Sequence, residues 1–250
     1  MIKLADYRNK YRFFRLDRTE DGVLTITFHT NGGAVVWGLE PIEELGFLWA
    51  DVGVDRENKV VIVTGAGDEF IGSVAVASGA WKDAESWDKI ASIVKRMTRN
   101  HLTIDVPMIA AVNGPALVHS EQALLCDIVI ASSTAVFQDS PHFISGMVPG
   151  DGVQIMYNHL LGGNRGRYFL FMGEKLSAQA ALDRGLISEV LSPEQLRNRA
   201  EEIARHILKQ PELVRRYTRQ LSVEPLRRLY AAYLEHGLAH EGLGAWAGGT

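Results

Sequence analysis

Val106-Pro107-Met108-Ile109-Ala110-Ala111-Val112-Asn113-Gly114 is the stretch that decides the fold of this 250-residue chain. Five apolar residues, Met108 to Val112, follow one another without a polar interruption. Asn113-Gly114-Pro115 then closes the run, and this combination is typical of a turn. A short apolar run that is bounded in this way predicts a buried strand.

Helical and strand patterns alternate on both sides of this strand. Before it, the predicted elements are a strand–turn–strand over residues 12–30, a helix over Glu40–Asp51, a strand over Val60–Thr64 and a helix over Trp87–Leu102. After it come a helix around Ser120–Cys126, strands at Ile128–Ala131 and Ala135–Phe137, and a long loop rich in Gly and Pro. The alternation predicts an α/β fold with parallel strands and crossover helices.

From about residue 195 the hydrophobic period becomes entirely helical. We therefore expect an α/β core over residues 1–195 and a helical C-terminal region over residues 196–250. Pro211 and Pro225 are expected near helix starts, where proline is tolerated. The block from Arg215 to Arg228 alternates with apolar and acidic residues, and it is interpreted as the solvated face of these helices.

Composition excludes several classes of partner. The net charge is −4, so the chain carries no electrostatic footprint for nucleic acid. No apolar run approaches the roughly 20 residues of a membrane span, and Met1–Tyr11 lacks the apolar centre of a signal peptide. The single cysteine, Cys126, lies in an apolar run, and we expect it in the core of a protein from a reduced, cytoplasmic setting.

Three segments, in order and properly spaced, resemble the crotonase (enoyl-CoA hydratase) superfamily. They are Val60–Gly65 with Asp68-Glu69-Phe70, Val106–Gly114, and Ser145–Gly152, and Met172–Ile187 is a weaker fourth. The resemblance covers roughly residues 12–195. It implies a spiral of ββα units, a helical C-terminal region, and a homotrimer or a dimer of trimers.

The superfamily stabilises an enolate or a related oxyanion with two backbone N–H groups, which are aimed at the place where charge develops. The resemblance places one donor near Val74 and the other at or beside His119. Hydratases of the family also carry two glutamates near their water. Here these two positions hold Gln122 and His142, which cannot reproduce a pair of carboxylates, so hydration of an enoyl thioester is not expected.

These replacements resemble the narrower branch of β-diketone hydrolases that is typified by 6-oxocamphor hydrolase. The segments that carry this resemblance are Phe137–Phe143, Gly146–Gly152, Gly162–Leu170 and Gly237–Glu241. The implied activity is hydrolysis of a carbon–carbon bond in a small β-diketone, a retro-Claisen reaction that gives a keto acid. Bicyclic, monocyclic and open-chain diketones all remain open, and the segment Ile71–Trp81 is expected to contribute apolar lining.

The residues fit this chemistry without a cofactor or a metal. His142 supplies a base whose ordinary pKa is near neutral, and Asp151, nine residues on, is expected to orient it. A water activated by His142 attacks one carbonyl, and the other half leaves as an enolate. We expect His119 and Trp37 to donate hydrogen bonds to that enolate, and Glu241 to orient water or a neighbouring histidine.

Structural roles for the same residues stay open at the level of sequence. His119 and Trp37 could be core residues, Asp151 could cap the helix that begins near Gly152, and Glu241 could be a solvated carboxylate. Ser140 and Ser145 offer a covalent alternative. A further pair, His236 and His240, has metal-ligand spacing but lacks further ligands nearby.

Two other functions also remain. One is that of an acyl-CoA hydratase, isomerase or thioesterase of the same fold, and the other is a non-catalytic scaffold with the crotonase fold.

Overall fold

The computed structural model describes residues 2–75 and 83–247 and confirms the α/β class. A six-stranded sheet has the order β1-β2-β4-β6-β7-β10. Its strands are β1 (Phe14–Arg18), β2 (Val23–Phe28), β4 (Val60–Gly65), β6 (Met108–Val112), β7 (Ile128–Ser132) and β10 (Glu189–Leu191). Only β1 runs antiparallel to its neighbour within this sheet, and the other pairs are parallel, as the alternation of patterns predicts.

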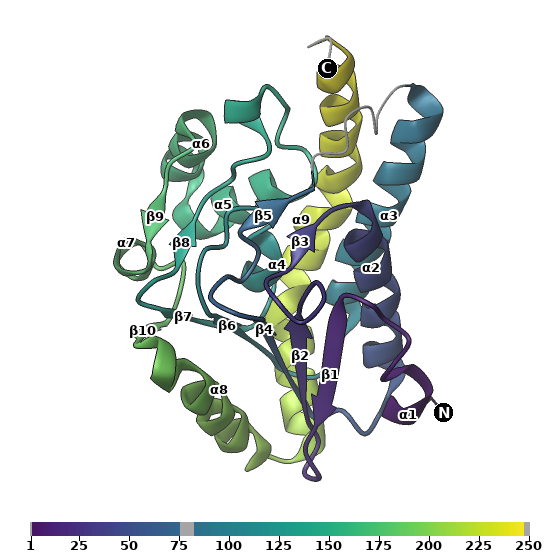
Figure 1. The fold of residues 1–250 in the computed structure, drawn as a ribbon, viewed down its shortest axis with the longest axis vertical. Helices are drawn as coiled ribbons and strands as arrows, with labels where there is room; N and C mark the ends of the chain where they lie inside the picture. The colour runs from purple at the N-terminus through teal and green to yellow at the C-terminus, as the bar shows by residue number, and fades with distance from the viewer. Residues whose placement is uncertain (1, 76–82, 248–250) are drawn as a thin grey trace.

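Helices cover both faces of this sheet (Figure 1). Strand β4 shows the division, because Val61 and Val63 enter the main core whereas Val60 and Ile62 enter a smaller one. The smaller core is covered by α8 (Pro193–Leu208), and the main core by α2 (Leu39–Val54), α3 (Ala84–Thr103) and α9 (Glu212–Ala247). Side chains of a strand alternate between its faces, so an unbroken apolar run supplies both layers.

The remaining elements are short. They are α1 (Leu4–Tyr7), β3 (Val36–Trp37), β5 (Ser73–Val74), α4 (Glu121–Leu124), β8 (Val136–Phe137), the 3-10 turn η1 (Phe143–Ser145), α5 (Val153–Leu161), α6 (Gly163–Met172), β9 (Leu176–Ser177) and α7 (Ala178–Asp183). Two small sheets form among them, a parallel β3–β5 pair and an antiparallel β8–β9 pair.

The arginine-rich block of α9 differs from its interpretation as a solvated face. Arg215, Arg216 and Arg219 are buried. The guanidinium of Arg219 donates to the Ile104 carbonyl at 2.7 Å and pairs with Asp127 at 2.5 Å. Arg216 and Arg219 contact Asp105 and Ile104, more than a hundred residues away in the chain, and helical periodicity cannot reveal such contacts.

Pro225 lies inside α9 and not near a helix start, so that expectation was wrong. Proline removes one N–H from the helical ladder, which frees the carbonyl of Leu221. Leu221 is 78% exposed, so water can replace the lost bond. None of the helices in the described ranges contains a stretch that could cross a lipid bilayer.

Candidate active site

The segments that follow four strands of the main sheet, including the short strands β3 and β5, carry four of the predicted site residues. Trp37 follows β2, Val74 follows β4, His119 follows β6, and His142 lies beyond β7 and β8. Carboxyl ends of parallel strands meet at one edge of a sheet, which is where α/β proteins place their ligands. Asp151 lies in the loop before α5, and Glu241 comes from α9 and closes the cluster from the helical side.

His142 is 3% exposed, and its two ring nitrogens face different carboxylates. Nδ1 lies 2.6 Å from Oδ1 of Asp139. Nε2 lies 3.5 Å from Oδ2 of Asp151 and 3.6 Å from Oε1 of Glu241. The closest carboxylate is therefore Asp139, three residues before the histidine, and the sequence analysis did not select it. A carboxylate at i−3 of a candidate base is the signal that could have identified it.

The surroundings of His142 favour its protonated form. Burial lowers the pKa of the imidazole, but the carboxylates of Asp151, Asp139 and Glu241 outweigh burial and hold this pKa well above its ordinary value. Burial also raises the pKa of the Glu241 carboxyl to about 7. The solvated position that sequence alone left open for Glu241 is therefore ruled out, because this side chain is buried and lies within reach of His142.

Asp151 divides its two oxygens between a structural contact and the site. Oδ1 accepts a hydrogen bond from the Val153 N–H at 3.2 Å, at the start of α5, although the N-cap residue of this helix is Gly152. Oδ2 lies 3.0 Å from Nδ1 of His119 and 3.5 Å from Nε2 of His142. Asp151 is thus closer to His119 than to the histidine that it was expected to orient.

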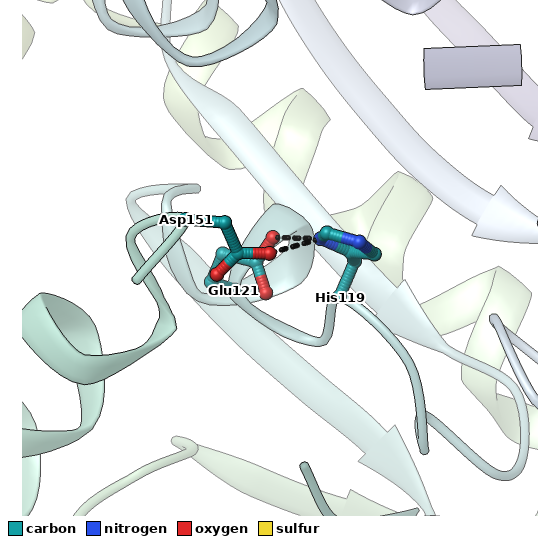
Figure 2. A group of neighbouring side chains, drawn as sticks. All are labelled: His119, Glu121 and Asp151. Atoms are coloured by element: carbon teal, nitrogen blue, oxygen red, sulfur yellow. Dashed lines mark hydrogen bonds and ion pairs between the residues drawn. The ribbon is translucent and has the colours of Figure 1, made fainter. Parts of the chain in front are cut away.

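His119 is held between two carboxylates (Figure 2). Its Nδ1 lies 2.9 Å from Oε1 of Glu121 and 3.0 Å from Oδ2 of Asp151. Burial lowers the pKa of this imidazole, but the two negative charges outweigh burial and raise the pKa to about 9. His119 is therefore an imidazolium at neutral pH.

The backbone of His119 is in the left-handed region, with φ of +46°. A residue other than glycine rarely adopts this conformation, and each such case costs of order 1 kcal/mol or more. The turn therefore holds a histidine where glycine would be less strained. In this position the imidazole reaches Glu121 and Asp151 and stands 5.6 Å, between ring centroids, from Trp37.

Trp37 is fully buried beside this histidine, and its indole Nε1 has no hydrogen-bond partner among the described residues. A buried indole N–H normally finds an acceptor, so this donor is available to a ligand oxygen. Val74 pairs with Trp37 across the β3–β5 ladder and is 42% exposed. Because Ala75 donates to the Trp37 carbonyl at 2.7 Å, the N–H of Val74 points to the opposite edge of β5.

The glutamate replacements do not leave the site without carboxylates. Gln122 is buried, and its amide donates to Oε1 of Glu121 at 3.2 Å. Acidic groups reach the two histidines from Glu121, Asp139, Asp151 and Glu241. The carboxylates therefore surround two imidazoles. This arrangement differs from the pair of glutamates beside a water that the sequence analysis describes for hydratases.

Within the described part of the chain, two sets of ligand-type side chains also have the proximity that a metal ion needs. In each set, His119 with Glu121 and Asp151, and His142 with Asp151 and Glu241, one atom per residue lies within 4.8 Å of the others. The first set is at hydrogen-bond distances of 2.9 and 3.0 Å, shorter than the edge of ~3.3 Å between ligands of a tetrahedral zinc. A shared proton therefore accounts for it.

A contact between two glycines fixes α9 against the loop that carries Asp151. A Cβ atom built on Gly237 would lie 2.2 Å from the Gly150 carbonyl oxygen, and one built on Gly150 would lie 2.2 Å from the Gly237 oxygen. Neither position has room for a side chain. This close approach brings Glu241, one helical turn beyond Gly237, into the cluster.

A cavity of about 490 Å³ lies beside the loop that follows His142. Its lining is Phe143, Gly146, Met147, Val148, Pro149, Asn158, Arg167, Leu170 and Phe171. The volume is in the range of small-ligand pockets. Of the lining expected from Ile71–Trp81, Val76 and Trp81 lie outside the described residues.

Comparison with known proteins agrees with the fold. Residues 18–237 match the enoyl-CoA hydratase/isomerase family. A short-chain enoyl-CoA hydratase of Clostridium acetobutylicum is 30% identical over 191 residues, which are 76% of this chain and 73% of that protein.

Two solved structures extend the comparison. An enoyl-CoA hydratase of Mycobacterium tuberculosis is 26% identical with a TM-score of 0.79, covering 94% of this chain and 97% of that one. A β-diketone hydrolase of the cyanobacterium Anabaena sp. PCC 7120, bound to (S)-3-oxocyclohexyl acetic acid, is 44% identical with a TM-score of 0.94, covering 96% of each chain. This match falls in the branch that the sequence resembles. The chain therefore belongs to the enoyl-CoA hydratase/isomerase family and is an enzyme of the crotonase fold.

Proposed function

We propose that this enzyme hydrolyses a carbon–carbon bond of a β-diketone. The observation that carries the proposal is that a buried histidine base lies close to hydrogen-bond donors that could bind a substrate oxygen. His142 presents Nε2 inside the cluster, while the Trp37 indole N–H lies buried beside the His119 imidazolium and has no acceptor among the described residues. The 44% identity to a β-diketone hydrolase over almost the whole chain supports the same reaction.

The reaction begins with a water between His142 and one carbonyl carbon of the substrate. Nε2 of His142 takes a proton from this water as its oxygen bonds to the carbonyl carbon. The tetrahedral alkoxide collapses, the bond to the central carbon breaks, and the second half leaves as an enolate. The proton held by His142 then passes to the enolate carbon, so the net change is the addition of one water and the product is a keto acid.

His119 and Trp37 stabilise the enolate oxygen in this scheme. Nδ1 of His119 must carry a proton because it faces two carboxylates at hydrogen-bond distance. A neutral imidazole would then leave Nε2 as an acceptor, so only the imidazolium can donate from Nε2. The pKa of about 9 supports that charged form, and a fixed donor of this kind contributes about 3–4 kcal/mol to a developing oxyanion.

The acid bound to the neighbouring structure suggests the first substrate to test. In 3-oxocyclohexyl acetic acid, one ring carbon lies both next to the ketone and opposite the carbon that carries the side chain. A bond between this ring carbon and the carboxyl carbon, formed with loss of water, gives a bridged bicyclic β-diketone. We propose this bicyclic class for the present enzyme, acting as a homotrimer or a dimer of trimers without a cofactor.

The test is an ultraviolet assay with purified enzyme on bridged bicyclic, monocyclic and open-chain β-diketones. We expect saturable loss of diketone absorbance, release of one keto acid per diketone, and a fall in kcat of at least about 100-fold in His142→Ala. Normal turnover by His142→Ala would refute the mechanism.

Enoyl-CoA hydration is the second candidate, and the names of the enoyl-CoA hydratase relatives favour it. A crotonyl thioester in the same assay separates the two reactions. Because Gln122 and His142 stand where hydratases of the family carry glutamates, we expect no turnover of the thioester. Turnover of the thioester alone would replace our proposal with hydration.

A further inference from the structure

We propose that Asp139 is the residue that positions His142, by holding Nδ1–H so that Nε2 is the basic atom. This inference rests on the proposed function for its kinetic consequence, but the positioning contact can be measured without a substrate. Asp139 and His142 are three residues apart, and their side chains are 1% and 4% exposed.

The distances separate Asp139 from the other carboxylates around His142. Oδ1 of Asp139 lies 2.6 Å from Nδ1, which is the length of a strong, charge-assisted hydrogen bond. Asp151 and Glu241 lie 3.5 and 3.6 Å from Nε2, beyond hydrogen-bond length. Among the described residues Asp139 therefore makes the shortest contact with the ring, and it determines which nitrogen carries the proton.

The backbone around Asp139 is fixed on both sides. Gln138 N–H donates to the Ala116 carbonyl at 3.2 Å, and Ser140 N–H donates to the Leu117 carbonyl at 3.0 Å. These bonds attach Asp139 to the strand segment that leads into the His119 turn. Asp151, in contrast, reaches His142 from the far end of a loop and also serves Val153 and His119.

The backbone of His142 is fixed as well. Its carbonyl accepts hydrogen bonds from Ser145 N–H at 2.7 Å and from Met147 N–H at 3.1 Å. With both backbones held, the Asp139 carboxylate fixes the ring rotation. Nε2 then points toward Asp151 and Glu241, where the attacking water is expected.

The consequence is a division of work among the carboxylates. Asp139 selects the tautomer of His142, Glu121 and Asp151 hold His119 as an imidazolium, and Glu241 faces the basic nitrogen. A histidine base loses activity when its orienting carboxylate becomes an amide, because the amide NH₂ favours the wrong tautomer.

The experiment compares Asp139→Asn with Asp151→Asn and with Asp139→Glu. Asp55→Asn is the matched control, since Asp55 is a buried, hydrogen-bonded aspartate paired with Tyr7 and Arg18 in another part of the fold. The first readout is the downfield proton resonance of the His142 Nδ1–H in ¹⁵N-histidine-labelled enzyme. We expect it in the wild type, Asp151→Asn and Asp55→Asn, and its loss in Asp139→Asn and in the reference variant His142→Ala.

Kinetics on a substrate diketone give the second readout. In Asp139→Asn we expect kcat to fall between about 10²- and 10⁴-fold with KM within about threefold, and partial recovery in Asp139→Glu. The ascending limb of the pH profile should move to lower pH, because loss of the Asp139 carboxylate lowers the pKa of His142. The other charged groups around His142, which are Asp151, Glu241 and the nearby His119, remain in place.

Asp139→Asn with wild-type kcat and pH profile, or with an intact Nδ1–H resonance, would overturn the assignment. A resonance lost in Asp151→Asn but kept in Asp139→Asn would transfer the role to Asp151. If no diketone is turned over, the proposed function fails, whereas the resonance still decides the positioning role.

Discussion

His119 combines a strained backbone with a charge that the site needs. Replacing it with glycine removes the imidazolium but relieves the left-handed conformation, where glycine is favoured. We expect His119→Gly to lower kcat about 100- to 1,000-fold, as the loss of one oxyanion donor does, and to lower the melting temperature despite the relieved strain, because Glu121 and Asp151 lose their buried cationic partner. Steady-state kinetics and thermal unfolding test this pair of effects, and a variant that keeps its kcat would remove His119 from the mechanism.

The two histidines must be in opposite protonation states, which predicts a bell-shaped pH profile. The base His142 works only when it is deprotonated, and its pKa lies above the ordinary value of 6.5, so kcat/KM should rise with pH on the alkaline side of 6.5. The donor His119 works only when it is protonated, so kcat/KM should fall as pH passes about 9. A profile that declines steadily from pH 6 would contradict this assignment.

At the scale of elements, the contact between Gly150 and Gly237 decides how close α9 comes to the loop of Asp151. Gly237→Ala places a methyl group 2.2 Å from the Gly150 carbonyl oxygen, so the helix must shift. We expect a loss of about 1–3 kcal/mol in unfolding free energy and a lower kcat, since Glu241 moves with the helix. Ala239→Gly, two residues along the exposed side of α9, is the control for an ordinary change in helix propensity.

The buried arginines of α9 predict a stability effect without a kinetic one. Arg219→Ala removes the partner of Asp127 and the donor to the Ile104 carbonyl. Loss of one member of a buried ion pair costs about 3–5 kcal/mol, and denaturant unfolding should show a cost near the lower end because Asp127 is partly exposed. In the folded fraction, kcat should stay near the wild-type value.

Sequence reasoning predicted most elements because their patterns are local. The apolar run Met108–Val112 forms β6, and the helix expected over Trp87–Leu102 is the centre of α3. Sequence reasoning missed contacts between residues that are far apart in the chain. Arg219 is polar in pattern but lies buried against a distant segment, and Pro225 continues a helix whose lost bond water can replace.

The candidate site was predictable to a similar extent. His142, Asp151, His119, Trp37 and Glu241 all come together at one edge of the sheet. The sequence did not show which carboxylate pairs with which histidine. Asp139, Asp151 and Glu241 are all acidic residues that a fold could bring to His142, and their spacing in the chain does not distinguish them. His142 lies 2.6 Å from Asp139 through Nδ1 and 3.5 Å from Asp151 through Nε2, and these distances are set by the fold.

For the whole molecule, the charge balance of the cluster predicts independence from metal. The proposed cycle moves protons between water, His142 and the enolate, and no step needs a Lewis acid. We expect enzyme that has been dialysed against EDTA to keep at least about 80% of its kcat, with less than about 0.1 equivalent of zinc per chain by elemental analysis. Activity that disappears with EDTA and returns with a divalent cation would assign the ligand-type groups around Asp151 to a metal instead.

The position of the reactive side chains at strand ends has a consequence for how such an enzyme can change its substrate. Val74 and the loop that leads to it lie beyond the strands whose apolar residues form the two cores, whereas Trp37 is itself part of the main core. Exchange of exposed residues such as Val74 alters the surroundings of the site without creating a void in the packed interior. The scaffold can therefore change its substrate through a few substitutions in these loops at low cost in stability, whereas changes at Trp37 also disturb the packing of the core.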